Sequence, residues 1–269
     1  MAVLIGCGDG LHTCGASAER IPCPLERVSL LACAPGRLAA ADVPARLLWD
    51  GRRVVSIDGG TEKLLWWNRH LLVLSGETDS LTLLDGQTGY PVTLAPAGVY
   101  PQDVCLLPQG DTAAVCGGAD GMIRLMALPS LEVLRTFRVP GVAARIAWAD
   151  GALHVLCTVE DGMLRCLVCR IPLKSGRCEP AATLDGLPGA IAPDGRGGVW
   201  VGAGEKLYHL PYRGATPDVT VGGFGLIGSL KRTERGLIIA DPVGDGAYRL
   251  NHGRLTLLRS GGVLCCAEA

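Results

Sequence analysis

Residues 101–139, PQDVCLLPQGDTAAVCGGADGMIRLMALPSLEVLRTFRV, are the stretch that decides the fold. This stretch holds four short apolar runs of 5 to 7 residues, which are separated by Pro108-Gln109-Gly110, by residues 117–121 and by Pro129-Ser130. Short runs between turn residues predict four β-strands joined by tight turns, and together they form an antiparallel meander. A single sheet of this kind cannot bury both of its faces, so it needs copies of itself on either side.

Other parts of the chain repeat this pattern with a period of about 38 residues, a length typical of propellers and other repeat architectures. Ten Asp-Gly pairs lie between apolar runs. Asp-Gly tolerates the positive φ angles of hairpin turns, so these pairs favour hairpins over helices. Segments that match the second run of the first stretch recur along the chain, and each predicts a strand buried on both faces: residues 71–76, 113–118, 198–202 and 237–241.

Comparison of these segments defines six complete units, which span residues 27–59, 61–98, 101–140, 142–187, 188–222 and 225–260. Residues 2–25 contain three strands of a further unit and lack its first strand. Residues 262–269, GVLCCAEA, form a lone apolar strand that can supply the missing first strand. We therefore predict one all-β domain over residues 1–269, a ring of seven four-stranded antiparallel blades whose two chain ends share a blade and leave no free sheet edge. Without docking of the terminal strand, the ring has six complete blades.

The repeat resembles those of YVTN-type and WD-repeat β-propellers, in which a Pro-Asp-Gly-like turn follows the inner strand and a Val-rich strand follows the turn. Pro108-Gln109-Gly110 and Pro193-Asp194-Gly195 carry this feature, and Ala149-Asp150-Gly151 carries it more loosely. No unit contains a literal YVTN sequence, and none ends in Trp-Asp. The resemblance implies a disc with a central channel. It implies no particular activity, because many functions share this fold.

The charge of the chain is nearly balanced, with a formal net charge of −1, and its 25 Lys and Arg residues are scattered. This distribution offers no basic patch for nucleic acid or for an anionic membrane. The opening MAVLIGCGDGLHTCG lacks the basic region of a signal peptide, and the sequence has no apolar run long enough to span a bilayer. We therefore expect a cytoplasmic monomer that binds neither nucleic acid nor membrane, with most of its 12 cysteines reduced.

Residues 223–228, GFGLIG, fit the G-x-G-x-x-G fingerprint of dinucleotide-binding domains, and Asp241 follows at a suitable distance. The fingerprint needs a helix that begins at the last glycine. Residues 229–235, SLKRTER, contain a single apolar side chain and soon reach Gly236. We therefore interpret the glycines as a passage between two blades and predict no cofactor.

Metal ligands are also hard to assemble from this sequence. Cys166 and Cys169 form a CxxC motif, but residues three apart in a strand point to opposite faces. The adjacent Cys265 and Cys266 alternate faces for the same reason. No two of the five histidines stand at metal-ligand spacing. The prediction is that the chain holds no metal.

Four charged residues at or near the starts of predicted inner strands are the candidate binding residues at the channel mouth. Glu62 and Asp103 precede inner strands, and Arg27 and Arg145 occupy comparable positions. A pair of arginines at the mouth could hold an anion bidentately. The alternative interpretation is that all four are rim charges engaged in salt bridges.

Neither a nucleophile elbow nor a P-loop is present, and no catalytic residues are assigned. We expect a rigid module whose loops bind a protein or peptide partner, not an enzyme. The alternative is a lactonase-like propeller hydrolase that acts on a small anionic or sugar-lactone substrate, in one version around a divalent metal. A third hypothesis is a sensor whose exposed thiols report redox state. The five tryptophans are expected to pack between blades, with a ligand-stacking platform as the alternative.

Overall fold

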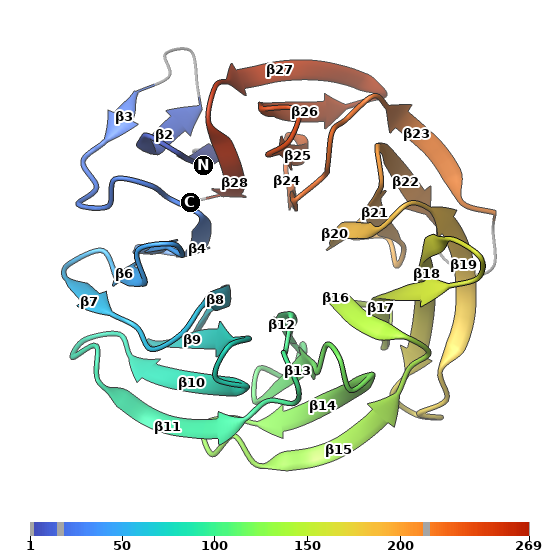
Figure 1. Ribbon diagram of the computed structural model, residues 1–269, viewed down its shortest axis with the longest axis horizontal. Coiled ribbons are helices and arrows are strands. Elements are labelled where there is room, and N and C mark those ends of the chain that lie inside the picture. The colour runs from blue at the N-terminus through green and yellow to red at the C-terminus, as the bar shows by residue number, and fades with distance from the viewer. Residues whose placement is uncertain (1–2, 15–18, 212–215, 269) are drawn as a thin grey trace.

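The computed structural model of the protein describes residues 3–14, 19–211 and 216–268. Their strands form seven four-stranded antiparallel sheets, which are arranged as blades in a ring (Figure 1). In each blade the inner strand lies nearest the centre of the ring and the outer strand at the rim of the disc. The described residues contain no helix, and hence none that could cross a membrane. The predicted fold class is confirmed.

Strand order from the channel outward follows chain order in six of the blades, and the remaining blade begins with the last strand of the chain. The strands have these bounds, blade by blade: β28 (Val263–Glu268), β1 (Val3–Cys7), β2 (Gly10–Cys14), β3 (Arg20–Ile21); β4 (Leu30–Ala34), β5 (Arg37–Asp42), β6 (Leu47–Trp49), β7 (Val54–Ser56); β8 (Thr61–Trp67), β9 (His70–Ser75), β10 (Ser80–Asp85), β11 (Pro91–Pro96); β12 (Asp103–Leu106), β13 (Thr112–Cys116), β14 (Met122–Ala127), β15 (Val133–Arg138); β16 (Val142–Ala149), β17 (Ala152–Glu160), β18 (Leu164–Pro172), β19 (Glu179–Asp185); β20 (Pro188–Pro193), β21 (Val199–Ala203), β22 (Lys206–Leu210), β23 (Asp218–Gly222); β24 (Ser229–Thr233), β25 (Gly236–Asp241), β26 (Gly246–Asn251), β27 (Arg254–Ser260).

The ring is closed by the C-terminal strand, as the sequence predicts. β28 pairs antiparallel with β1, and Val3 lies opposite Glu268 at one end of the ladder. The Gly8 amide extends this contact by donating to the Gly262 carbonyl at 2.8 Å. Both ends of the chain therefore build one sheet (Figure 1). Residues 2, 15–18 and 269, which belong to the predicted shared blade, lie outside the described residues.

The Asp-Gly pairs serve as turns, although in more than one way. Eight of the ten glycines have positive φ angles, which a β-carbon would strain: Gly10, Gly51, Gly59, Gly121, Gly151, Gly162, Gly186 and Gly195. Two of these pairs, at Gly59 and Gly186, connect successive blades instead of closing a hairpin. The remaining two glycines, Gly86 and Gly246, do not have positive φ. At Gly86 a β-carbon would instead collide with the Arg69 carbonyl oxygen.

The hydrophobic core is divided into clusters that lie between blades. The largest residues of each cluster come from the facing sheets of neighbouring blades, and all five tryptophans join such clusters. Cys166 and Cys169 of β18 belong to different clusters, so they face opposite sides of their sheet as the strand period requires. All 12 cysteines are free thiols in this structure.

Residues 223–228 form the connection between β23 and β24, and no helix follows them. β24 begins at Ser229, at the point where a dinucleotide-binding domain would begin its helix. The Gly225 and Leu226 amides donate to the Asp241 carboxylate at 2.8 Å each. Asp241 therefore holds the glycine-rich connection against its own blade, and the interpretation as a passage between blades is confirmed.

Candidate functional site

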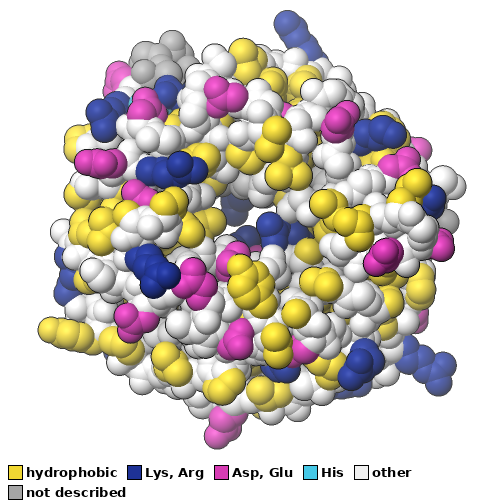
Figure 2. All heavy atoms as spheres, viewed as in Figure 1, with side chains coloured by type: hydrophobic (Ala, Val, Ile, Leu, Met, Phe, Trp, Pro, Cys, Tyr) yellow, Lys and Arg dark blue, Asp and Glu magenta, His cyan; other side chains and the backbone are white. Residues whose placement is uncertain are grey.

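The candidate site is the central channel, a cavity of about 650 Å³ lined by residues of all seven inner strands. Figure 2 shows the hollow at the centre of the disc, with basic side chains inside it and acidic side chains at its rim. Glu62, Asp103 and Arg145 line the channel. The inner strands therefore bring together three of the four residues that the sequence singles out.

Several inner strands have a β-bulge near their start. The pairing of β8 with β9 skips Glu62. Both Glu62 and Lys63 line the channel. The pairing of β16 with β17 skips Ala144 directly before Arg145 in the same way. Bulges of this kind redirect side chains next to functional sites.

Asp103 is a buried carboxylate that joins three successive blades. Its side chain lies in an ion pair with Lys63 of β8, with 3.1 Å between Oδ1 and Nζ. Its Oδ2 accepts a hydrogen bond from the Ile146 amide of β16 at 3.1 Å, and its Oδ1 accepts one from its neighbour Val104 at 3.0 Å. Only 3% of Asp103 is exposed. Both of its oxygens thus take part in holding the inner strands together.

Arg145 continues this chain of contacts around the channel. Its Nε donates to the Gly189 carbonyl of β20 at 2.9 Å, and its Nη1 donates to the Ala144 carbonyl at 2.8 Å. Burial raises the pKa of Glu62, and the positive charge of Arg145 offsets part of that rise. The half-buried Glu62 is therefore a carboxylate that releases its proton at a higher pH than usual.

The channel lining includes three further charged residues that are not among the four candidates: Lys231 and Arg232 of β24 and Glu268 of β28. Among the described residues, none of them takes part in an ion pair. The lining then holds four basic residues and three acidic ones, counting Lys63, Arg145, Glu62 and Asp103, so its formal charge is 4 − 3 = +1. The signal that could have found Lys231 and Arg232 is the charged run in SLKRTER at the start of an inner strand.

Arg27 does not line the channel. It is an exposed residue in the connection from β3 to β4. The next residue, Val28, is fully buried and its amide donates to the Cys7 carbonyl, which anchors this connection against β1. Arg27 therefore remains on the outside, and it does not pair with Arg145 across the cavity.

Four cysteines are also among the residues that line the channel: Cys33, Cys105, Cys265 and Cys266. Burial raises the pKa of Cys33 and of Cys266 to about 11. A thiol with so high a pKa is protonated near neutral pH and is a weak nucleophile. These side chains consequently give the redox-sensor hypothesis no support.

Within the described residues, the one group of three side chains close enough to share a metal ion is Cys7, Asp9 and His12, and it lies at the β1–β2 turn away from the channel lining. His12 Nε2 is 2.9 Å from Asp9 Oδ1. Arg259 of β27 places its Nη2 at 3.3 Å from the same histidine nitrogen and at 3.5 Å from Asp9 Oδ2. The guanidinium thus brings a positive charge to the place where a cation would bind, and it disfavours a metal there.

No family model matches this chain, and no curated protein matches it either. Solved structures do match it in fold. The WD40 β-propeller domain of Doa1 is similar with a TM-score of 0.70 and 12% sequence identity, over 88% of this chain and 85% of that one. Hydrazine synthase of Kuenenia stuttgartiensis is similar with a TM-score of 0.68 and 15% identity, over 87% of this chain and 79% of that one. Likeness at this identity concerns the fold alone, and the class that fold and comparison define together is the seven-bladed β-propeller.

Proposed function

We propose that the protein is a rigid interaction module that takes a peptide or a loop of a partner protein into the mouth of its central channel. The observation that carries this proposal is that some charged residues of the channel join inner strands and others do not. Asp103, Lys63 and Arg145 are engaged in contacts between inner strands, whereas Lys231, Arg232 and Glu268 are not. A fixed frame that carries uncommitted charges suits recognition, because the frame loses little conformational entropy when a partner binds.

The size of the channel supports the same proposal. A cavity of about 650 Å³ admits a few side chains of an extended segment, and its walls are inner strands instead of mobile loops. WD40-like propellers commonly act as protein-interaction modules, and the fold of this chain is of that kind. Basic and acidic residues both line the channel, so we expect the bound segment of the partner to carry charged groups of both signs.

The hydrolase alternative has no contact among the described residues that favours it. A metal-dependent version needs several carboxylates that converge on one point of the channel. Asp103 is bound by Lys63 and by backbone amides. Both of its oxygens are therefore already engaged in contacts within the protein, and the enzyme alternative stays a prediction.

The test is site-specific photo-crosslinking in cells of the source organism. A photoreactive residue at position 231 should capture a partner, and the same residue at position 254, an exposed site on the outer strand β27, should not. The captured protein would then be titrated against Lys231→Glu/Arg232→Glu and against Arg254→Glu. We expect the channel variant alone to bind at least about tenfold more weakly, because it reverses two charges at the interface. Equal affinities for both variants, or capture from position 254 alone, would contradict the proposal.

The cytoplasmic location forms part of this proposal and has a separate test. Cells expressing the protein would be treated with a thiol reagent that does not cross membranes. Because Cys23 and Cys178 are partly exposed, a protein outside the cytoplasm would be labelled without cell lysis. We expect labelling only after lysis, and labelling of intact cells would place the protein elsewhere.

A further inference from the structure

A second cavity, of about 460 Å³, is lined mainly by residues of the β4–β7 blade and of the β8–β11 blade. Four turns contribute to its walls. Gly36 lies in the β4–β5 turn, Gly51 in the β6–β7 turn, Arg69 in the β8–β9 turn and Gly86 in the β10–β11 turn. In an antiparallel blade these first and third turns lie at the same edge, so the four turns of two neighbouring blades come together at one face of the disc.

This cavity is markedly basic. Arg37, Arg52 and Arg69 line it, and Asp50 is the one acidic residue among the lining residues, so the formal charge of the lining is 3 − 1 = +2. The carboxylate of Asp50 is already engaged. Its Oδ1 accepts the Arg52 and Arg53 amides at 2.9 Å each, and its Oδ2 lies 3.2 Å from Arg53 Nε.

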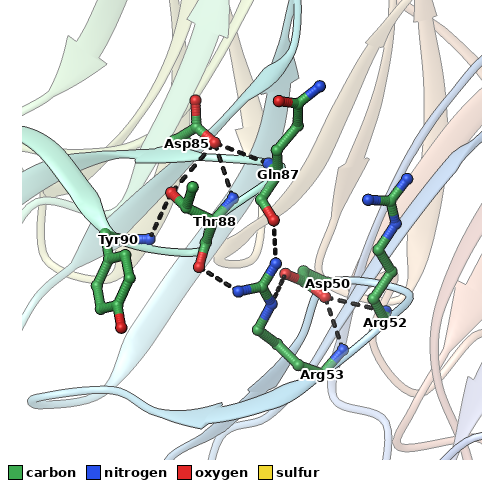
Figure 3. A network of polar contacts seen from close by, with 7 residues as sticks. All are labelled: Asp50, Arg52, Arg53, Asp85, Gln87, Thr88 and Tyr90. Carbon is green, nitrogen blue, oxygen red and sulfur yellow. Dashed lines mark hydrogen bonds and ion pairs between the residues drawn. The ribbon is translucent and has the colours of Figure 1, made fainter.

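The wall of the cavity is held rigidly by a network that joins the two blades (Figure 3). The Arg53 guanidinium donates to the Gln87 and Thr88 carbonyls of the next blade. Asp85 fixes that second turn, because its Oδ1 accepts the Gln87 amide at 2.9 Å and the Thr88 amide at 2.8 Å. The turn that carries Arg52 is therefore locked to the turn beside Gly86.

Arg52 itself is exposed, and its guanidinium makes no hydrogen bond or ion pair with the residues that the structure describes. Figure 3 shows its side chain extending from the locked turn with no contact drawn to the guanidinium. Arg69 is only loosely held, at 3.6 Å from Asp85, and 61% of its side chain is exposed. Two arginines of the lining are thus available to a ligand.

Aromatic side chains provide the apolar part of the same cavity. Trp49 and Trp66 both line it, and Trp66 is fixed by a hydrogen bond from its Nε1 to the Ala32 carbonyl at 3.2 Å. Arg37 lies over the Trp66 ring, with its Cζ at 5.6 Å from the ring centroid. Gly86 allows this packing, because a β-carbon there would approach the indole to 2.9 Å. The Arg37 guanidinium therefore stands beside apolar surface, where its attraction for an anion is less screened than in open water.

We propose that this cavity is a binding site for a phosphate monoester. A phosphate monoester carries a charge of about −2 near neutral pH, which balances the +2 of the lining, whereas a single carboxylate would leave half of it uncompensated. Guanidinium groups hold phosphate oxygens with paired hydrogen bonds, and Arg52 and Arg69 have donors to spare. The ester group can be that of a small molecule or that of a phosphorylated side chain. This cavity shares Trp66 with the channel lining, but its arginines do not line the channel, and the proposal does not depend on the function proposed for the channel.

The experiment titrates the full-length protein with phenyl phosphate, with inorganic phosphate, with a phosphoserine peptide and with the same peptide unphosphorylated. Tryptophan fluorescence reports binding, because Trp49 and Trp66 line the cavity, and calorimetry gives the affinity. Saturable binding of the phosphate compounds that weakens as salt is added is the expected result. Phenyl phosphate that binds more tightly than the phosphopeptide identifies a small ester as the ligand, and the reverse order identifies a modified protein.

Variants decide whether binding occurs at this cavity. Arg52→Ala should bind the preferred ester about tenfold more weakly, because it removes one charged donor group. The Arg52 guanidinium makes no hydrogen bond or ion pair with the described residues, so the melting temperature of this variant should stay that of the wild type. Arg254→Ala, at an exposed arginine on β27 that lines neither cavity, should bind like the wild type. The proposal is overturned by an absence of saturable phosphate binding, by equal affinity for the unphosphorylated peptide, or by an unchanged affinity in Arg52→Ala.

Discussion

Asp103 illustrates how a charged residue in the channel can stabilise the ring without meeting a ligand. It is 3% exposed and receives the Ile146 amide from the next blade and the Lys63 ammonium from the preceding one. The sequence left both a ligand contact and a salt bridge open for Asp103, and it favoured the salt bridge. The contacts that distinguish these roles come from strands far apart in the chain, so no local pattern could reveal them.

Replacement of Asp103 by alanine should destabilise the protein by about 3 kcal/mol, because it leaves the buried Ile146 amide without its acceptor. Asp111→Ala is the control, since Asp111 is an exposed residue in the turn before β13 and should change stability by less than about 0.5 kcal/mol. The free energies of unfolding are measured by urea titration. Equal losses for the two variants would show that Asp103 has no role in joining the blades.

His154 gives the protein a pH-dependent stability. It is 8% exposed, and burial together with the positive charge of Arg170 lowers its pKa to about 4. Between that value and its ordinary pKa of about 6.5, the unfolded chain binds a proton that the folded chain does not. Stability should therefore fall as pH drops through this range, by an amount on the order of 3 kcal/mol.

The free energy of unfolding is measured at intervals between pH 7 and pH 4. This range spans the pKa of about 6.5 in the unfolded chain and of about 4 in the folded protein. His154→Leu should lose most of this dependence, because it has no group to protonate. His252→Asn, which alters an exposed turn histidine with positive φ, should retain it. The same slope in His154→Leu as in the wild type would contradict the assignment.

At the scale of elements, the sequence predicts strands well because their ends are marked chemically. Asp-Gly and Pro-containing turns delimit the apolar runs, and each blade repeats them. The bulges were not predicted. The displacement of Glu62 from the β8–β9 ladder depends on how two strands align, which their separate sequences do not encode. Lys63 and Lys231 were missed as channel residues and Arg27 was expected there, because the sequence alone does not show which residues near the start of an inner strand line the channel.

Close approach between blades makes some glycines indispensable for reasons other than turn geometry. Gly202 lies inside β21, and a β-carbon there would stand 2.6 Å from Cβ of Ile227, which comes from the connection to the next blade. Gly202→Ala should therefore destabilise the protein by about 1 to 3 kcal/mol. In Gly222→Ala the nearest atom would lie 3.8 Å away, so that variant should stay within about 0.5 kcal/mol of the wild type. Thermal melting of the two variants measures this difference. A Gly202→Ala variant that is as stable as the wild type would contradict the close packing of Ile227 against Gly202.

At the scale of the whole molecule, stability depends on a strand that comes last in the chain. β28 contributes the buried Val263 and the ladder with β1. Each ladder hydrogen bond is worth about 1 kcal/mol and a buried valine about 1.5 to 3 kcal/mol, against about 5 to 15 kcal/mol for a whole domain. Deletion of residues 262–269 should therefore give an aggregating or strongly destabilised protein. A truncated chain that stays monomeric and melts within a few degrees of the full-length protein would contradict this expectation.

A disulfide trap tests the closure of the ring most directly. Val3 and Glu268 lie opposite each other in the β1–β28 ladder, so the double variant Val3→Cys/Glu268→Cys should form a crosslink under mild oxidation of the folded protein. Peptide mapping by mass spectrometry identifies this bond among the native thiols. Val3→Cys/Ser175→Cys is the control, because Ser175 lies in the exposed β18–β19 turn of another blade. The closed ring predicts the first crosslink when folded protein is oxidised, a much lower yield when the oxidation is carried out in urea, and no crosslink in the control. Equal yields from the two pairs in folded protein would contradict it.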